Sequence, residues 1–200
     1  MVGITSYGAY IPRYRINRQY ILMGMGWFNP VTFPHAKGEK AVANNDEDSL
    51  TMAVAAGRDC LKGLKTDNID QVYMASTTFP YDERQNATVM SYALNLGEEV
   101  MAMDIGGSIS AGLRALITAE NAIKAGKSKG AIVCSADTRL GKMGSVEEHT
   151  YGDGAAALTL GTENVIAEII GSYSLSMDFV DHRRTTNNRT DKNWEDRWIR

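Results

Sequence analysis

Residues 104–116 read DIGGSISAGLRAL, a pattern by which many enzymes mount a nucleophile. Asp104 closes an apolar strand, Gly106 and Gly107 make a tight turn, and a regular helix is predicted from about Ile109. The unpaired N–H groups and the dipole at a helix N-terminus stabilise an anion such as a thiolate. The first predicted helical residue is Ile109, whose side chain is not a nucleophile. The sequence therefore predicts a helix N-terminus suited to a nucleophile but without one.

Ser108, Cys60 and Cys134 are candidates to replace the missing nucleophile. Ser108 shares the helix N-terminus, but a serine needs a neighbouring base, and none is close in sequence. An N-cap role for Ser108 is therefore favoured over catalysis. Cys60 and Cys134 lie inside apolar elements, which favours buried, unreactive thiols. No metal is predicted, because the sequence has no clustered Cys/His pattern and its histidines are dispersed at positions 35, 149 and 182.

The composition is that of an ordinary soluble globular protein. The chain has 200 residues, 44% apolar and 22% charged, with a net charge of −3. No dense Lys/Arg run points to nucleic acid, and no segment approaches the ~20 apolar residues of a membrane span. With no visible secretory signal and two separate cysteines, the sequence predicts a cytoplasmic protein.

The stretch IPRYRINR, residues 11–18, is one of the two most basic segments of the chain. Its three arginines, Arg13, Arg15 and Arg18, follow an opening strand and a proline turn. Guanidinium groups bind phosphate in a bidentate manner, so the segment could hold a phosphorylated small molecule. A solvated surface segment is the competing interpretation.

The order of predicted elements sets the fold class. Strands are expected over 2–11, 69–77, 99–105, 130–137, 152–161 and 164–179. Helices are expected from the acidic stretch Asp46–Asp48 to Leu64, from a cap at Asn86 to about Gly97, and over 109–125. Residues 17–45 are predicted to be an irregular excursion and 138–151 a polar loop. The sequence therefore predicts an α/β layered fold with helices packed on a sheet.

The predicted domain organisation is one unit over residues 1–180, followed by a polar tail over 181–200. Trp194 and Trp198 are large apolar groups in that charged tail. They are expected to dock, either within this domain or on another chain.

This order of elements resembles the thiolase superfamily, most closely the archaeal-type 3-hydroxy-3-methylglutaryl-CoA synthases and more distantly ketoacyl synthase III. The stretches that carry the resemblance are GITSYGAYIPRYRI, GEKAVANNDEDSLTMA, DIGGSISAGLRAL and YGDGAAALTLG. The resemblance implies one βαβαβαββ unit with a mixed five-stranded sheet, the first half of a fold that contains two such units. It also implies a coenzyme A thioester as substrate, with Arg13, Arg15 and Arg18 near the nucleotide end of CoA.

The resemblance also shows which family residues are missing. The family cysteine that carries the acyl group falls at Ile109, and the family glutamate base falls at Thr77. A threonine hydroxyl has no accessible pKa for removing a proton from carbon. The family histidine that polarises the substrate carbonyl comes from the second unit, and His182 is expected to be a solvated tail residue.

Two functions remain open on this basis. The chain is either a subunit or fragment of an acyl-CoA enzyme that forms or cleaves C–C bonds, or a non-catalytic structural subunit. Aldol-type chemistry suits the first hypothesis, because it needs no covalent acyl-enzyme. The expected partner is a second thiolase-unit chain or a second copy, with a zinc-ribbon/OB-fold protein as a further candidate. The helix over 109–125 is expected to meet the second unit through its small residues Ala111, Gly112, Ala115 and Ala119.

Overall fold

The computed structural model describes residues 1–177, 183–185 and 188–192. The chain divides into two compact units, of which the first comprises Met1–Pro12, Ala43–Thr138 and Gly154–Ser172. The second comprises Arg13–Val42, Arg139–Asp153 and the described residues from Tyr173 onward. His182, Trp194 and Trp198 lie outside the described residues, and the boundaries 1–180 and 181–200 stay a prediction.

A mixed six-stranded sheet forms the centre of the first unit, in the order β5-β4-β6-β7-β1-β8. β4 pairs in parallel with both β5 and β6, and the remaining neighbours are antiparallel. The fold class predicted from the sequence is thus confirmed. The strand bounds are β1 Gly3–Tyr10, β4 Gln71–Ala75, β5 Met101–Ile105, β6 Ala131–Asp137, β7 Gly154–Gly161 and β8 Ala167–Glu168.

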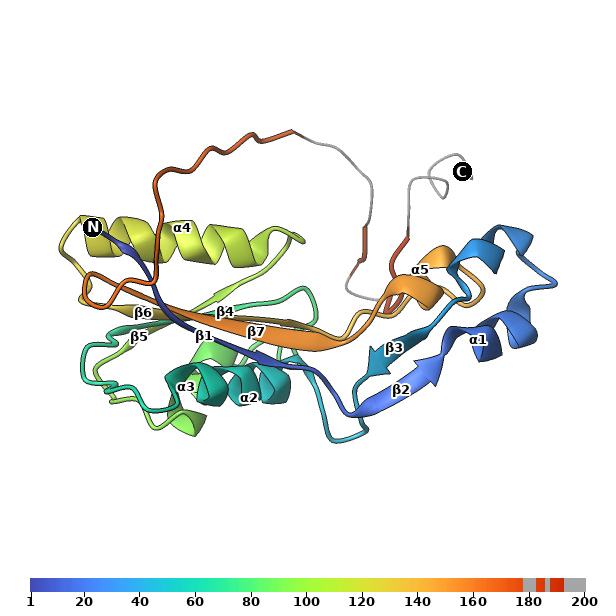
Figure 1. Ribbon diagram of the computed structural model, residues 1–200, viewed down its shortest axis with the longest axis horizontal. Coiled ribbons are helices and arrows are strands. Elements are labelled where there is room, and N and C mark those ends of the chain that lie inside the picture. Colours follow the sequence, from blue (N-terminus) through green and yellow to red (C-terminus); the bar gives the residue numbers. More distant parts are fainter. Residues whose placement is uncertain (178–182, 186–187, 193–200) are drawn as a thin grey trace. The chain divides into compact units, whose positions relative to one another are not determined.

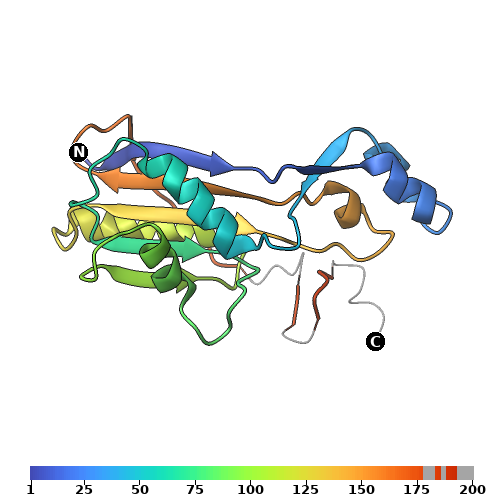
Figure 2. The same cartoon turned by 90° about the horizontal axis from the view of Figure 1, so that it is seen from below.

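Helices cover both faces of this sheet. α2 (Ser49–Leu61) and α3 (Asn86–Ala93) lie on one face and α4 (Ala111–Lys124) lies on the other (Figures 1 and 2). Each face carries its own core cluster, and β4 is buried along its whole length between them. This double coverage explains why β4 and β6 are continuous apolar runs.

α2 shows how the sequence sets an element boundary. The Asp48 side chain accepts a hydrogen bond from Thr51 N at 2.7 Å, and Thr51 Oγ1 accepts one from Asp48 N at 2.7 Å. This reciprocal capping box satisfies two orphan N–H groups, as the acidic start predicted. The helix ends at Leu61 and not at Leu64, because the chain turns at Gly63, which has a φ of +78°.

The expected role of the small residues on α4 was wrong. Ala111, Ala115 and Ala119 are buried against the sheet of their own unit, beside Tyr73 and Val133. A Cβ added to Gly112 would lie 3.2 Å from Ser135 Oγ on β6, so this glycine also faces the sheet. Small side chains let the helix approach β4 and β6 closely, and the exposed apolar residues of α4 are different ones.

The predicted strand over 164–179 was also largely wrong. Only Ala167 and Glu168 pair, with Gly3 and Ile4 of β1, and they add a short sixth strand to the expected five. Residues 169–177 form no strand, and Ile170 and Tyr173 are 93% and 88% exposed. Their apolar alternation has no sheet to cover within the described residues.

The second unit contains more regular structure than the irregular excursion predicted for 17–45. β2 (Tyr14–Asn17) and β3 (Glu39–Val42) form an antiparallel pair. Between them lie α1 (Arg18–Met25) and a 3₁₀ helix over Pro30–His35. The loop predicted over 138–151 carries the short α5 (Val146–Thr150). None of the helices in the described part of the chain is long and apolar enough for a membrane span.

Gly8 is a position where close packing requires a glycine. A Cβ there would lie 2.3 Å from Cys60 N and 2.5 Å from Ala56 O, both backbone atoms of α2. We therefore expect Gly8→Ala to lower the free energy of unfolding by about 1–3 kcal/mol through overpacking. Urea denaturation measures the change. Gly97→Ala is the matched control, because a Cβ at Gly97 meets no atom within 4 Å; equal stability of the two variants would contradict the packing argument.

Candidate functional site

The candidate site lies where the parallel strands β4, β5 and β6 end. Their pairing places Ala75 beside Ile105 and Ser135, so the segments that follow these strands meet at one edge of the sheet. Ligand sites in open α/β sheets lie at this carboxyl edge. The edge brings together two residues singled out from the sequence, Thr77 and Ile109, and adds Asp137.

The two glycines of DIGG form the predicted tight turn. Gly107 has a φ of +76°, which a residue with a Cβ rarely adopts. A Cβ on Gly106 would lie 3.1 Å from the Phe79 ring and 3.2 Å from Ser76 O. The backbone of Ser76 also donates to Ile105 O at 3.2 Å. The turn after β5 therefore packs directly on the turn after β4.

The start of α4 lies two residues later than predicted. The helix begins at Ala111, so Ile109 lies in the preceding turn, and Ser110 is the N-cap residue. Ser108 is therefore not the N-cap. Its Oγ accepts a hydrogen bond from Ser110 N at 3.2 Å and pairs with Ser110 Oγ at 2.8 Å, while Arg114 Nε donates to Ser110 Oγ at 3.2 Å.

Ile109 projects from the mount into solvent in this chain, with 72% of its surface exposed. A side chain at this position therefore has access to a ligand, but isoleucine can offer only apolar contact. The position lacks a nucleophile because its residue is an isoleucine, and not because the side chain is buried. The geometry around it remains that of a turn leading into a helix.

Asp137, at the end of β6, binds the turn that contains Thr77. Its Oδ1 accepts hydrogen bonds from Ser76 Oγ at 2.9 Å, Thr77 N at 2.6 Å, Thr77 Oγ1 at 3.0 Å and Thr78 Oγ1 at 3.1 Å. The Thr77 hydroxyl thus acts as a donor to a carboxylate. Sequence reasoning missed Asp137, although its position at the end of a buried strand, the same position that singled out Asp104, was a usable signal.

Asp104 has a structural role at the same edge. Its Oδ2 accepts from Asn86 N at 2.7 Å and Asn86 Nδ2 at 2.9 Å, and its Oδ1 accepts from Ala87 N at 2.6 Å. Asp104 therefore caps α3 from a neighbouring strand. The predicted cap, Asn86, is instead the first helical residue and is buried.

The two cysteines are poor nucleophiles in this fold. Both are free and buried. Burial raises the pKa of Cys60, and burial raises the pKa of Cys134 far above the ordinary thiol range. Neither forms an appreciable amount of thiolate at neutral pH, in keeping with their predicted role as small core residues.

The predicted CoA-side arginines all lie in the second unit. Arg13 and Arg15 are exposed, and Arg15 donates to the carbonyl of Tyr14 at 2.8 Å. Arg18 is half-buried; its Nε donates to His149 O at 2.8 Å and its Nη1 to Lys37 O at 2.9 Å. Arg18 therefore braces the backbone of its own unit.

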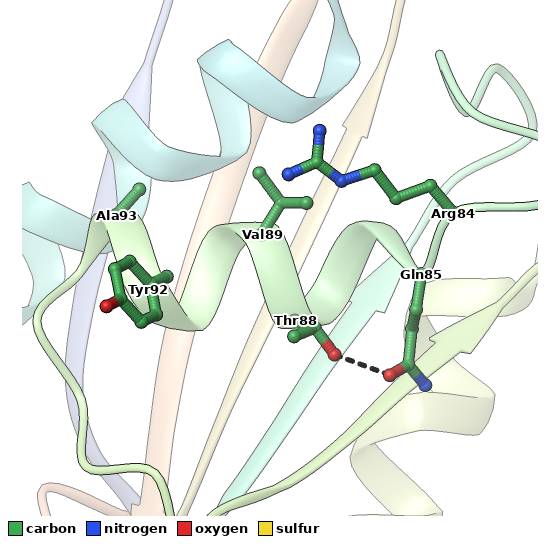
Figure 3. A pocket seen from close by; sticks show the side chains of 6 residues that line it. All are labelled: Arg84, Gln85, Thr88, Val89, Tyr92 and Ala93. Carbon is green, nitrogen blue, oxygen red and sulfur yellow. Dashed lines mark hydrogen bonds between the residues drawn. The ribbon is translucent and has the colours of Figure 1, made fainter.

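A pocket of about 580 Å³ lies along α3. Figure 3 shows its lining, six side chains from the start and the flank of that one helix: Arg84, Gln85, Thr88, Val89, Tyr92 and Ala93. The lining contains no acid, thiol or imidazole, so the pocket offers a binding surface without a reacting group. No cluster of His, Cys, Asp or Glu suited to a metal ion occurs within residues 1–177, 183–185 and 188–192.

A cysteine introduced at position 109 tests whether the start of α4 stabilises an anion. We expect the thiol introduced by Ile109→Cys to react with iodoacetamide much faster than Cys60 or Cys134, because it is exposed and the helix start favours a thiolate. Peptide mapping after timed labelling measures the three rates, with Thr118→Cys as an exposed control about two turns into the helix. Equal labelling at positions 109 and 118 would contradict stabilisation of an anion at the start of α4.

The amino-acid sequence is similar to those of known archaeal proteins. No family model matches the chain. The hydroxymethylglutaryl-CoA synthase of Methanocaldococcus jannaschii is 36% identical over 190 residues, which are 92% of this chain and 54% of the relative. That of Archaeoglobus fulgidus is 33% identical over 187 residues, again 92% of this chain and 54% of the relative. The chain thus spans about half the length of the curated relatives it matches.

Solved structures show the same fold. An HMG-CoA synthase complexed with CoA superposes with a TM-score of 0.85 at 16% identity, over 98% of this chain and 51% of that one. MvaS in complex with 3-hydroxy-3-methylglutaryl coenzyme A gives 0.85 at 22% identity, over 99% and 49%. A priming β-ketosynthase gives 0.71 at 21% identity, over 82% and 51%. The resemblance inferred from the sequence is confirmed, and the chain is a thiolase-fold relative of the archaeal hydroxymethylglutaryl-CoA synthases.

Proposed function

We propose that the chain is one half of a thiolase-fold assembly that acts on acyl-CoA thioesters and forms or cleaves a C–C bond without a covalent acyl-enzyme. The observation that carries the proposal is the combination of 36% identity to an HMG-CoA synthase with an isoleucine, 72% exposed, at the nucleophile position. Aldol-type chemistry needs an oxyanion site and a proton acceptor, but no thiol.

The relatives support the proposed substrate class. The matched synthases act on CoA thioesters by name, and two structures of the same fold contain CoA or HMG-CoA. In this chain the exposed guanidinium groups of Arg13 and Arg15 are suited to the CoA phosphates. Arg18, which donates to two backbone carbonyls, supports the segment that carries them. The two free, buried cysteines suit a reducing compartment such as the cytoplasm.

A non-catalytic structural subunit is the second candidate, and one observation favours it. Ile109 and Leu113 expose 72% and 65% of their surface on the same end of α4. Apolar side chains at that position can pack on a catalytic partner chain instead of meeting a substrate. A non-catalytic subunit is then expected to bind its partner but no CoA of its own.

Calorimetric titration of CoA into the assembled protein tests the proposal. We expect Arg15→Ala to weaken binding by about 1–3 kcal/mol through the loss of a charged hydrogen bond. Lys65→Ala, which removes an exposed positive charge on a turn of the other unit, serves as the control and should bind normally. If the wild-type assembly binds no CoA, the acyl-CoA function is wrong and the structural role is favoured.

The proposed partner is a second thiolase-unit chain or a second copy, with a zinc-ribbon/OB-fold protein as a further candidate. The exposed apolar side chains on the α4 side of the sheet include Met101, Met103, Ile109 and Leu113. Strand alternation places Met101 and Met103 on the same face as Ile105, which packs against the α4 cluster. A second unit of the fold would cover this surface.

Sedimentation tests this assembly. We expect the chain to sediment as a complex, and Leu113→Glu to shift it toward the monomer without lowering the melting temperature, because Leu113 contacts no core within its own unit. Thr118→Glu, at another exposed position of α4, is the control. A cooperatively melting wild-type monomer would rule out an obligatory second unit.

A further inference from the structure

We propose that Asp137 is the proton acceptor of this chain, acting through Oδ2 on the carbon next to the thioester carbonyl of an acyl-CoA. The inference rests on the proposed function, and it assigns the step for which neither Ile109 nor Thr77 has the chemistry. It rests on the hydrogen bonds of the Asp137 carboxylate, which fall on only one of its two oxygens.

The hydrogen bonds of Asp137 all fall on one oxygen. Four donors from the turn Ser76–Thr78 surround Oδ1, at 2.6–3.1 Å. Among the described residues Oδ2 accepts no hydrogen bond, and no arginine or lysine there forms an ion pair with the side chain. The four donors fix the direction of the carboxylate and leave Oδ2 with unused acceptor capacity.

The position of the group suits contact with a ligand. Asp137 is the last residue of β6 and is only partly buried, unlike Ile132, Cys134 and Ala136 before it. The turn that it binds also packs against Gly106, in the segment that leads to Ile109 and α4. A carboxylate held at this edge meets the geometric requirement for a general base, which must be fixed and accessible.

Three other groups at this edge, Asp104, Ser108 and Thr77, are engaged in hydrogen bonds of their own. Asp104 uses both oxygens to cap α3. Ser108 shares its hydroxyl with Ser110. Thr77 donates its hydroxyl to Asp137 itself, and so acts as a positioning residue for the carboxylate.

The proposed step balances as a simple proton transfer. Oδ2 takes a proton from the carbon next to the thioester carbonyl. The C–H electron pair forms the new C=C bond, and the carbonyl π pair moves onto oxygen to give the enolate. Return of a proton from Asp137, after exchange with solvent, restores the thioester. The step therefore predicts exchange of the acetyl hydrogens of acetyl-CoA with deuterium, with no second substrate present.

Deuterium exchange into acetyl-CoA in D₂O, followed by NMR on the assembled protein, tests the assignment. We expect Asp137→Asn to slow exchange at least 100-fold, the lower range for a general base. This variant is unusually specific, because the amide oxygen can accept the same four hydrogen bonds and only Oδ2 is replaced. Asp67→Asn is the control. It removes an exposed acid that precedes β4, at the end of the strand away from Asp137, and should leave exchange unchanged.

A second pair of variants separates positioning from folding. Thr77→Val removes one donor to Oδ1 and is expected to slow exchange several-fold, whereas Thr77→Ser keeps the hydroxyl and should restore it. Melting temperatures of all variants are measured in parallel. Slow exchange in Asp137→Asn with an unchanged melting temperature supports the assignment.

The outcomes distinguish this inference from the proposed function. Wild-type exchange that persists in Asp137→Asn overturns the role of Asp137 and leaves acyl-CoA chemistry standing. Calorimetric binding of acetyl-CoA without any wild-type exchange also overturns the role of Asp137, while the binding part of the proposed function survives. Absence of both binding and exchange overturns the two together.

Discussion

The parallel pairing of β4 with two neighbours is the constraint on which the rest of the first unit depends. β4 is buried at every residue and lies between β5 and β6 in the same direction, so three chain segments end at one edge. Parallel strands need crossover connections, and those connections are the helices that cover the two faces. The candidate residues Thr77, Ile109 and Asp137 lie in segments that meet at one edge because of this pairing and not because of their spacing in sequence.

Two carboxylates at this edge, those of Asp104 and Asp137, have different hydrogen-bond partners. Asp104 has both oxygens occupied by the start of α3 and so stabilises a helix. Asp137 has one oxygen surrounded by hydroxyl and amide donors from the turn after β4. Both aspartates end strands in almost the same sequence setting. Their different roles follow from which element lies across the edge from each, which is tertiary information.

Much of the fold could be predicted from the sequence, since long periodic segments and capping residues act locally. The acidic start of α2, the glycine turn after β5 and the buried run of β6 are of this kind. The failures share one cause. The small residues of α4 and the apolar alternation after Glu168 have patterns that fit either a sheet of the same unit or a partner, and only the packed structure shows which. For the same reason the sequence indicates that Asp137 ends a buried strand, whereas its hydrogen bonds to the turn after β4 depend on contacts across the sheet and could not be predicted.

The placement of the two cysteines bears on how the protein tolerates oxidants. Cys60 and Cys134 are the only cysteines in the sequence, and burial keeps both as protonated thiols within the core. Peroxide attacks the thiolate, and susceptibility follows exposure. With an isoleucine exposed before α4, the sequence places no thiol at the start of that helix. The chemistry proposed for Asp137 uses a carboxylate, so oxidation of a thiol would not remove its reacting group.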